Sequence, residues 1–427
     1  MKSSKRKICQ VLALVVSGLG ASAAMAAPVI QGGGSSLVAP TIGAEITSFG
    51  TGVGAFTYFS VGSGAGQSAF LGNQPTFFGA GVTGTVDFAN SDAALLSAQI
   101  ASYKTGLGAT NGPLIQVPYI VTPIAFPIVN NGQSITSTTT PQTTPGQAHS
   151  IALNDDDLCG IFSGKLSNWN QVINPETGSA YPNSAPISVI YRTDGSGTTE
   201  LLTRHLAAVC TTGNTAAGVT FKDSLTFTDS FPAGIPAAPA FIGASGSGGV
   251  RTALTNSSTA AVAYLSPDYT NTFLAPSSSV VTAAGAAQLQ VASVKNTANG
   301  VYYAPNYTNA TLALGTASVP AGKPGASNQL NWVPAAGNPS TGYPVSGTSQ
   351  IILSQCYKDP NVTTAVLSFL NDHYTDASYA AIVHGNGFDT VPSSFLTAIQ
   401  ADFLGNSSGF NLNIGNASVC TGSVVGR

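Results

Sequence analysis

The 427-residue sequence contains very little charge. Only 7% of its residues are Asp, Glu, Lys or Arg, whereas about 25% is usual for soluble domains. The 14 basic residues are outnumbered by 17 acidic ones, so the chain lacks the basic stripe that nucleic-acid binding requires. With 43% hydrophobic residues, it also lacks the composition of a disordered protein. These features predict a folded protein outside the cytoplasm, long enough for two domains.

Beyond the N-terminus, the chain has no run of 18 apolar residues that could form a membrane helix. The first 26 residues combine a basic start, an apolar run over 8–19 and the sequence Ala24-Met25-Ala26. This order predicts a secretory signal peptide over 1–26, cleaved after Ala26. Its removal leaves 10 basic and 17 acidic residues, a net charge of −7. The mature protein is therefore expected to be periplasmic or secreted.

Cysteine and histidine patterns argue against the common metal and redox motifs. The chain has no C-x-x-C, which zinc ribbons and thioredoxin-like sites use. No H-x-x-x-H spacing occurs, so surface or capping roles are predicted for His149, His205, His373 and His384. The cysteines outside the signal peptide are even in number, which favours two disulfides in an exported chain. They are Cys159, Cys210, Cys356 and Cys420, and their spacing permits three pairings. No metal or cofactor is predicted.

Strand-like runs alternate with helix-like ones, which is typical of α/β architecture. Strands are expected at 57–61, 86–89, 187–191, 260–265 and 349–353, and helices at 63–71, from Asn154, around 202–209, and at 361–373, 377–384 and 393–404. Between 211 and 345, Ser, Thr, Ala, Asn, Gly and Pro predominate, which indicates long loops around a few core elements.

Three glycine-rich turns stand out, at 32–37, 62–66 and 194–199. Each is expected to precede a helix, where backbone N–H groups and nearby hydroxyls form a ready anion site. Arg192 stands just before the third turn, and its planar fork of donors suits a tetrahedral oxyanion. The turns together predict an anion-binding site. Taken singly, each turn could be an ordinary turn, and Arg192 could form a surface salt bridge.

Two catalytic motifs are disfavoured. A nucleotide-binding P-loop needs Gly-Lys followed by Ser or Thr, but Lys165 precedes Leu166 and Lys323 precedes Pro324. One G-x-S-x-G match occurs at 405–409, where serine hydrolases carry their nucleophile. No His or Asp lies beyond it, so the hydrolase order of residues cannot be completed.

A series of short motifs follows in a fixed order along the chain. They are Gly32-Gly33-Gly34, Val61-Gly62-Ser63-Gly64, Ala89-Asn90-Ser91-Asp92, Leu114-Ile115-Gln116-Val117-Pro118, Leu158-Cys159-Gly160-Ile161-Phe162-Ser163-Gly164, Tyr191-Arg192 through Thr199-Glu200, and Ser354-Gln355-Cys356-Tyr357. This series resembles the DING family of exported phosphate-binding proteins, relatives of the phosphate-specific periplasmic binding proteins. The resemblance spans nearly all the mature chain and is weaker between 211 and 342. It departs at Val29-Ile30-Gln31-Gly32, where the family begins Asp-Ile-Asn-Gly.

The resemblance implies an α/β fold of the two-lobed, type II periplasmic-binding-protein kind, with ligand in the interlobe cleft. The first lobe would combine 27–120 with 346–427, and the second would span 121–345. Hinge strands would lie near 114–126 and 343–353. The family's cysteine pairing implies Cys159–Cys210 and Cys356–Cys420.

The resemblance also implies a set of phosphate ligands. Ser36, the Leu37 N–H and Ser63 would bind from the first lobe, and Asp92 would accept a proton from the ligand. Arg192 would make the charged contact, and Ser196, Gly197 and Thr198 would close the site. From the residues alone, Asp92 could instead cap a helix through 93–95.

The predicted function is that of a non-catalytic, monomeric protein that binds inorganic phosphate. It would deliver phosphate to a membrane ABC importer or scavenge it outside the cell. A secreted phosphatase that uses the same pocket is the alternative. A structural or adhesive surface protein that keeps the fold is a third possibility.

Overall fold

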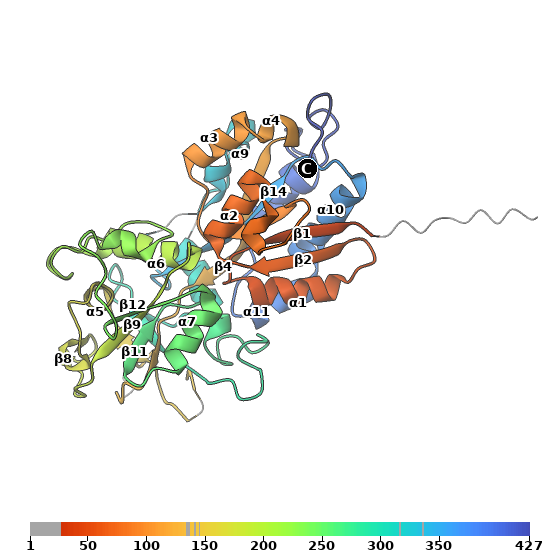
Figure 1. The fold of residues 1–427 in the computed structure, drawn as a ribbon. Helices are drawn as coiled ribbons and strands as arrows, with labels where there is room; N and C mark the ends of the chain where they lie inside the picture. The colour runs from red at the N-terminus through yellow and green to blue at the C-terminus, as the bar shows by residue number, and fades with distance from the viewer. Residues whose placement is uncertain (1–26, 134–136, 141, 145, 316, 335–336) are drawn as a thin grey trace, which may run out of the picture.

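The computed structural model describes residues 27–427 except 134–136, 141, 145, 316 and 335–336. The predicted signal peptide over 1–26 lies outside these residues. The described chain forms two α/β lobes, each built on its own sheet (Figure 1). No helix in this part of the chain is both long and apolar enough to cross a membrane.

The first lobe contains a five-stranded sheet in the order β2-β1-β3-β14-β4. Its strands are β1 (Val29–Gly34), β2 (Ala55–Ser60), β3 (Phe88–Ser91), β4 (Leu114–Pro123) and β14 (Ser346–Ser354). β1 runs parallel to β2 and β3, whereas β14 runs antiparallel to both β3 and β4. The two ends of the described chain, red and blue in Figure 1, therefore build one lobe.

Helices cover both faces of this sheet (Figure 1). Successive side chains of a strand point to opposite faces. Phe88 accordingly packs in the core that also holds Phe369, and Ala89 packs with Phe70 on the other side. The helices of this lobe are α1 (Ala39–Phe49), α2 (Ser63–Gly72), α3 (Ser97–Thr105), α4 (Gly108–Asn111), α10 (Pro360–Thr375), α11 (Ala377–Gly385) and α12 (Ser393–Ile399).

The second lobe contains a mixed sheet in which β10-β9-β11-β5-β12-β13 are neighbours and β6 pairs with β12. Its strands are β5 (Pro127–Val129), β6 (Ile151–Leu153), β9 (Ile187–Arg192), β10 (Phe241–Ala244), β11 (Ala260–Ala263), β12 (Gln290–Lys295) and β13 (Tyr302–Tyr303). The short strands β7 (Ile173–Asn174) and β8 (Ser179–Ala180) form a separate pair. The main helices here are α5 (Asp155–Ser163), α6 (Gly197–Val209) and α7 (Gly246–Thr255).

Two chain segments run side by side between the sheets. The Ile124 N–H donates to the Val345 carbonyl over 2.8 Å, and the Tyr343 hydroxyl donates to the Ile124 carbonyl over 3.0 Å. These segments fall within the ranges expected for hinge strands. The domain boundaries themselves stay a prediction. Helix α8 (Tyr307–Leu314), within the predicted second lobe, packs against β4 and β14 of the first.

The prediction of a glycine-rich turn starting at residue 32 is wrong, because Gly32, Gly33 and Gly34 form the end of β1. Glycine is needed there because neighbouring chain comes very close. A Cβ atom on Gly32 would lie 2.4 Å from the Phe88 ring, and one on Gly34 would lie 2.1 Å from the Asn90 carbonyl oxygen. The chain turns only after the strand, at 35–38.

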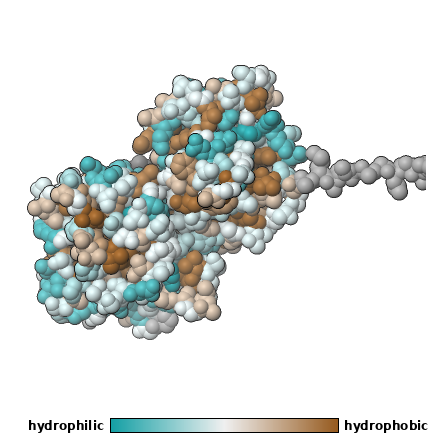
Figure 2. Space-filling model, viewed as in Figure 1, coloured by the Kyte–Doolittle hydropathy of each residue, from teal (hydrophilic) through white to brown (hydrophobic). Residues whose placement is uncertain are grey.

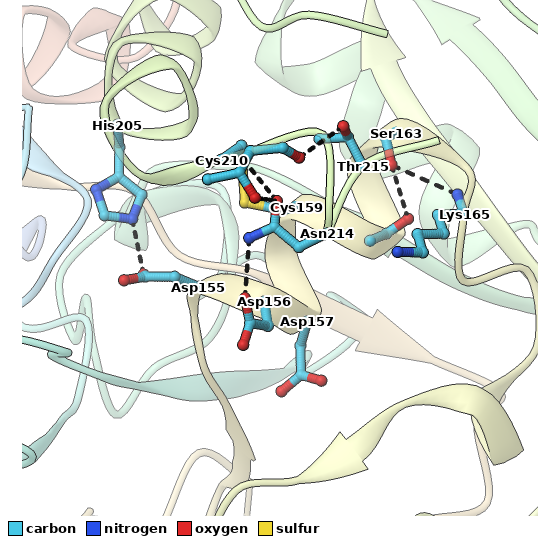
Figure 3. The surroundings of a disulfide bond; sticks show 12 residues. Asp155, Asp156, Asp157, Cys159, Ser163, Lys165, His205, Cys210, Asn214 and Thr215 are labelled. Atoms are coloured by element: carbon cyan, nitrogen blue, oxygen red, sulfur yellow. Dashed lines mark hydrogen bonds and ion pairs between the residues drawn. A yellow bond between two sulfur atoms is a disulfide. The ribbon is translucent and has the colours of Figure 1, made fainter. Parts of the chain in front are cut away.

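Both predicted disulfides are confirmed, as Cys159–Cys210 and Cys356–Cys420. The first joins α5 to the residue that follows α6 (Figure 3). The second joins the segment after β14 to the C-terminal segment.

The prediction of surface or capping histidines is wrong for His205 and His373, which are both buried. His205 Nε2 lies 3.0 Å from the Asp155 carboxylate, beside the first disulfide (Figure 3). His373 Nδ1 lies 2.9 Å from the fully buried Glu45 carboxylate. A buried polar group is tolerated when it is paired, and each histidine has a carboxylate partner.

The surface reflects the scarcity of charge in the sequence. Figure 2 shows one face of the molecule mainly in pale colours, with small hydrophobic patches on both lobes. Scattered apolar side chains of this kind are normal on a folded protein.

Candidate anion-binding site

The predicted site residues come together where the two lobes meet. Ser36 and Leu37 follow β1, Ser63 begins α2, and Asp92 follows β3. From the second lobe, Arg192 ends β9 and the 196–198 segment begins α6. Of the predicted side chains, those of Ser36, Ser63, Asp92, Arg192, Ser196 and Thr198 are no more than 3% exposed. Strand ends and helix N-termini thus place polar groups at one buried point.

Asp92 is held by hydroxyl groups of its own lobe. The Ser35 hydroxyl lies 2.7 Å from Oδ1 and 2.8 Å from Oδ2 of Asp92, and the Asp92 N–H donates to Ser63 Oγ over 3.2 Å. Burial raises the pKa of Asp92, although the hydrogen bond from Ser35 and the charge of Arg192 act to lower it. The helix that Asp92 could have capped does not form, because α3 begins only at Ser97.

Arg192 forms a buried ion pair with Asp194. Arg192 Nε donates to Asp194 Oδ1 over 2.7 Å, and Nη2 pairs with Oδ2. Burial acts to raise the pKa of Asp194, but the guanidinium hydrogen bonds and charge lower it below its usual value. The third guanidinium nitrogen, Nη1, lies 3.4 Å from Ser247 Oγ. The alternative of a surface salt bridge is wrong, since the Arg192 side chain is 2% exposed.

Direct hydrogen bonds join the lobes at this point. Ser36 Oγ lies 2.9 Å from Ser247 Oγ, and the Ser247 N–H donates to Ser36 Oγ over 3.1 Å. The Gly64 N–H donates to the Gly195 carbonyl over 2.9 Å. The first turn of α2 and the turn before α6 therefore meet backbone to backbone. The prediction of a turn over 62–66 is wrong beyond Gly62, because α2 begins at Ser63.

Gly197 shows why glycine is required in these turns. A Cβ atom at this position would lie 2.6 Å from Ser63 Oγ and 2.6 Å from the Asp92 Cβ. Real Cβ atoms essentially never approach other atoms so closely, so a larger residue would push the lobes apart.

The remaining predicted ligands differ in what they contact. Thr198 Oγ1 is buried and has no hydrogen-bond partner within the described part of the chain. Ser196 Oγ accepts from the Thr199 N–H over 3.2 Å and so caps α6. The Leu37 N–H donates to Ser35 Oγ over 3.1 Å. Thr198 is thus the predicted ligand whose hydroxyl is left without a protein partner.

Sequence reasoning missed Ser35, Asp194 and Ser247 as parts of this site. Asp194 stands two residues after Arg192, a spacing that lets the two side chains pair. Ser247 lies in the Gly-Ser-Gly sequence that begins α7, directly after β10, the same strand and helix order as at the third predicted turn. That repetition was the available signal. Ser35 adjoins a predicted ligand, but no local pattern separates it from Ser36.

The chain is similar to known proteins over most of its length. Residues 21–372 match the model of the PBP superfamily domain. Alkaline phosphatase L of Pseudomonas aeruginosa is 32% identical over 408 residues, which cover 95% of this chain and 96% of that protein. A phosphate-binding protein of an unknown prokaryotic organism is 34% identical over 86% of this chain and 92% of its own.

Solved structures give the same result. The phosphate-bound structure of PfluDING, a high affinity periplasmic phosphate-binding protein, superposes with a TM-score of 0.72 at 34% identity, covering 93% of this chain and 99% of that one. An ancestral soluble variant of the Human Phosphate Binding Protein gives a TM-score of 0.74 at 35% identity, with the same coverages. The chain therefore belongs to the PBP superfamily and, within it, to the DING-type phosphate-binding proteins. The resemblance stated from the sequence motifs is confirmed.

Proposed function

We propose that this protein binds inorganic phosphate with high affinity between its two lobes. The observation that carries the proposal is the burial of Arg192, Asp92 and Thr198 at the point where the lobes meet, with the Thr198 hydroxyl left without a partner in the described part of the chain. A buried anion is stable only when it is paired and hydrogen-bonded. Phosphate would be held by one guanidinium together with neutral hydroxyl and amide donors, in keeping with the scarcity of charge in the chain.

Each group has a distinct proposed role. Arg192 Nη1 and the Thr198 hydroxyl would donate to phosphate oxygens, together with Ser36 and Ser63. The backbone N–H groups at the start of α6, including that of Gly197, would add donors at a positive helix end. The Leu37 N–H and Ser196 would complete the set from either side. Ionised Asp92 would accept the proton that phosphate retains, in a short charge-assisted hydrogen bond.

Export and delivery form the second part of the proposal. A signal peptide cleaved after Ala26 would send the mature protein to the periplasm or outside the cell, and the similar protein PfluDING is periplasmic. There the protein, as a monomer, would pass phosphate to an ABC permease or scavenge it outside the cell.

We propose that the protein is not catalytic. The alternative is a phosphatase, and two relatives from Pseudomonas aeruginosa carry the name alkaline phosphatase L. Contact between the lobes supports binding of free phosphate. At Gly64, a single added Cβ would lie 3.2 Å from the Gly195 Cα. The leaving group of a phosphate ester would need space that this contact fills.

Isothermal titration of protein stripped of bound ligand tests the proposal. Phosphate and arsenate should bind with one site per chain, and sulfate should not. A chromogenic phosphate ester should not be turned over by the same preparation. Absence of phosphate binding would overturn the proposal. Ester turnover that disappears in Arg192→Ala would instead establish the phosphatase.

A further inference from the structure

A cavity of about 680 Å³ opens between the first lobe and the 326–332 segment of the predicted second lobe, lined by residues that take no part in the anion site. It lies between α3 and α4 on one side and the chain around α9 (Gly322–Ala326) on the other, elements that lie close together in Figure 1. The C-terminal segment, held by the Cys356–Cys420 disulfide, contributes Val419 and Val424 to the wall. The volume is within the range of about 300–1,000 Å³ that small-molecule sites occupy.

The floor of this cavity is apolar and aromatic. Leu114, Trp332 and Phe403 line it, and all three side chains are at most 5% exposed overall. Trp332 Nε1 donates to the Ala326 carbonyl over 2.8 Å, so the indole has its polar atom satisfied within the protein. The floor therefore offers no unpaired indole donor, and the half-buried Ile100, Leu412, Val419 and Val424 that also line the cavity supply the apolar surface an occupant would cover.

Charge at the cavity has one sign. Lys104 on α3 is the charged residue among those that line it, and no Asp or Glu is among them. The Lys104 ammonium is exposed and forms no ion pair or hydrogen bond with any residue the structure describes. In a chain where acidic residues outnumber basic ones, an apolar cavity with a single unpaired cation is complementary to an apolar body that carries one negative charge.

We propose that this cavity binds an amphiphilic monoanion, namely a free acyl-chain carboxylate. The acyl chain would lie over the floor and against the half-buried side chains of Ile100, Leu412, Val419 and Val424, where burial of apolar surface supplies the affinity. The carboxylate would face the Lys104 ammonium at the rim. This site is separate from the proposed phosphate site, and either could exist without the other.

The protein carries a built-in reporter for the test. Its two tryptophans are Trp169, in the second lobe, and Trp332, in the cavity floor. Trp169 Nε1 has no hydrogen-bond partner in the described part of the chain, so Trp169→Phe removes no known hydrogen bond. In this variant the fluorescence comes from Trp332 alone. Decanoate, kept below its micelle-forming concentration, should change that fluorescence in a saturable way.

Protein variants and a cationic analogue of decanoate test the proposal. Each variant is first shown to have the melting temperature of the wild type. Ala109→Phe would fill the mouth and should weaken decanoate binding at least tenfold, whereas Ala101→Phe, exposed on α3 away from the cavity, should not. Lys104→Gln should weaken it about two- to fivefold, as for an exposed ion pair. Decyltrimethylammonium should bind more weakly than decanoate. No saturable signal, unchanged binding to Ala109→Phe, or tighter binding of the cationic analogue would overturn the proposal.

Discussion

Ser36 of the first lobe and Ser247 of the second are joined by two hydrogen bonds across the lobe interface, at 2.9 and 3.1 Å. Ser247 also lies beside Nη1 of Arg192, at 3.4 Å. The Ser247 hydroxyl therefore contacts both the opposite lobe and Arg192, the residue proposed to make the charged contact with phosphate. Ser247 is the second residue of α7, a helix outside the predicted ligand set, so the structure adds a third helix start to the site.

We expect Ser247→Ala to release phosphate faster. Loss of the neutral hydrogen bond to the Ser36 hydroxyl, at about 1 kcal/mol, corresponds to roughly 5-fold weaker binding, and loss of the long contact with the Arg192 guanidinium adds to it. Most of the change should be in the dissociation rate, because interface mutations act mainly there. Stopped-flow measurement of phosphate release checks this. Ser245→Ala, an exposed residue on the same turn, is the control. An unchanged rate in Ser247→Ala would show that the lobes close without this contact.

Arg192→Ala should weaken phosphate binding by about 1.5–3 kcal/mol, or roughly 10- to 100-fold, because charge-assisted hydrogen bonds are lost. Arg192→Lys should recover only part of the affinity, since an ammonium cannot bind Asp194 bidentately and still reach the ligand. Isothermal titration measures both. Arg204→Ala, which removes a cation from α6 outside the site, should bind as wild type. A folded Arg192→Ala protein with unchanged affinity would remove Arg192 from the site.

Asp92 should decide between phosphate and sulfate. Sulfate has no proton to donate at neutral pH, so it would place an oxygen against the Asp92 carboxylate and be repelled. Asp92→Asn should therefore lose more discrimination against sulfate than it loses phosphate affinity. Titration of both anions into both proteins measures the ratio. Asp87→Asn, which changes another buried carboxyl group, controls for the loss of charge. If Asp92→Asn rejects sulfate as strongly as wild type, Asp92 does not distinguish the two anions by accepting the proton of phosphate.

Asp157 should make stability fall as the pH rises. Burial raises its pKa to about 7 from a usual value of 3.8, although backbone N–H groups of Asn154 and Ile173 act to lower it. Between these pH values the folded protein keeps a proton that the unfolded chain has lost. The free energy of unfolding therefore decreases with rising pH across this window, by about 1.4 kcal/mol per unit of pKa shift at most.

Asp157→Asn should remove this dependence. Between pH 4 and pH 8, the melting temperature of wild type should fall by more than that of the variant. The variant gives up one acceptor in the cap of α5, which lowers its stability at every pH. Melting curves from pH 4 to 8 measure the difference. Asp229→Asn removes an exposed carboxylate that does not act on Asp157 and should leave the slope unchanged. Parallel curves for wild type and Asp157→Asn would contradict the assignment.

Local signals in the sequence were sufficient to predict several elements. Asn154 before three aspartates predicted a helix start, and Asn154 Oδ1 accepts from the Asp157 N–H over 2.9 Å at the start of α5. The third glycine turn likewise predicted α6. Capping and turn chemistry depend on residues a few positions apart, so the information is present in a short window.

Features that depend on residues far apart in the chain could not be predicted from short stretches of sequence. His373 is buried because Glu45, 328 residues away, supplies its partner, and His205 depends on Asp155, 50 residues away. Gly32 and Gly34 lie in a strand because Phe88 and Asn90 come close. The cysteine pairing came from the family resemblance, since spacing alone permitted three pairings. The Gly-Ser-Gly sequence at 246–248 indicates a helix start, but the contact of Ser247 with Ser36 depends on residues 211 positions apart.

The position of β14 has a consequence for how the protein is assembled. β14 lies between β3 and β4 and is antiparallel to both, yet it comes near the end of the chain. Until residues 346–354 have been made, β3 and β4 have no strand between them, and the loop that carries Asp92 lacks one of its supports. Pairing over such long sequence separations is slow. We therefore expect the sheet of the first lobe to be completed late in folding, after all the strands of the second lobe's sheet have been synthesised.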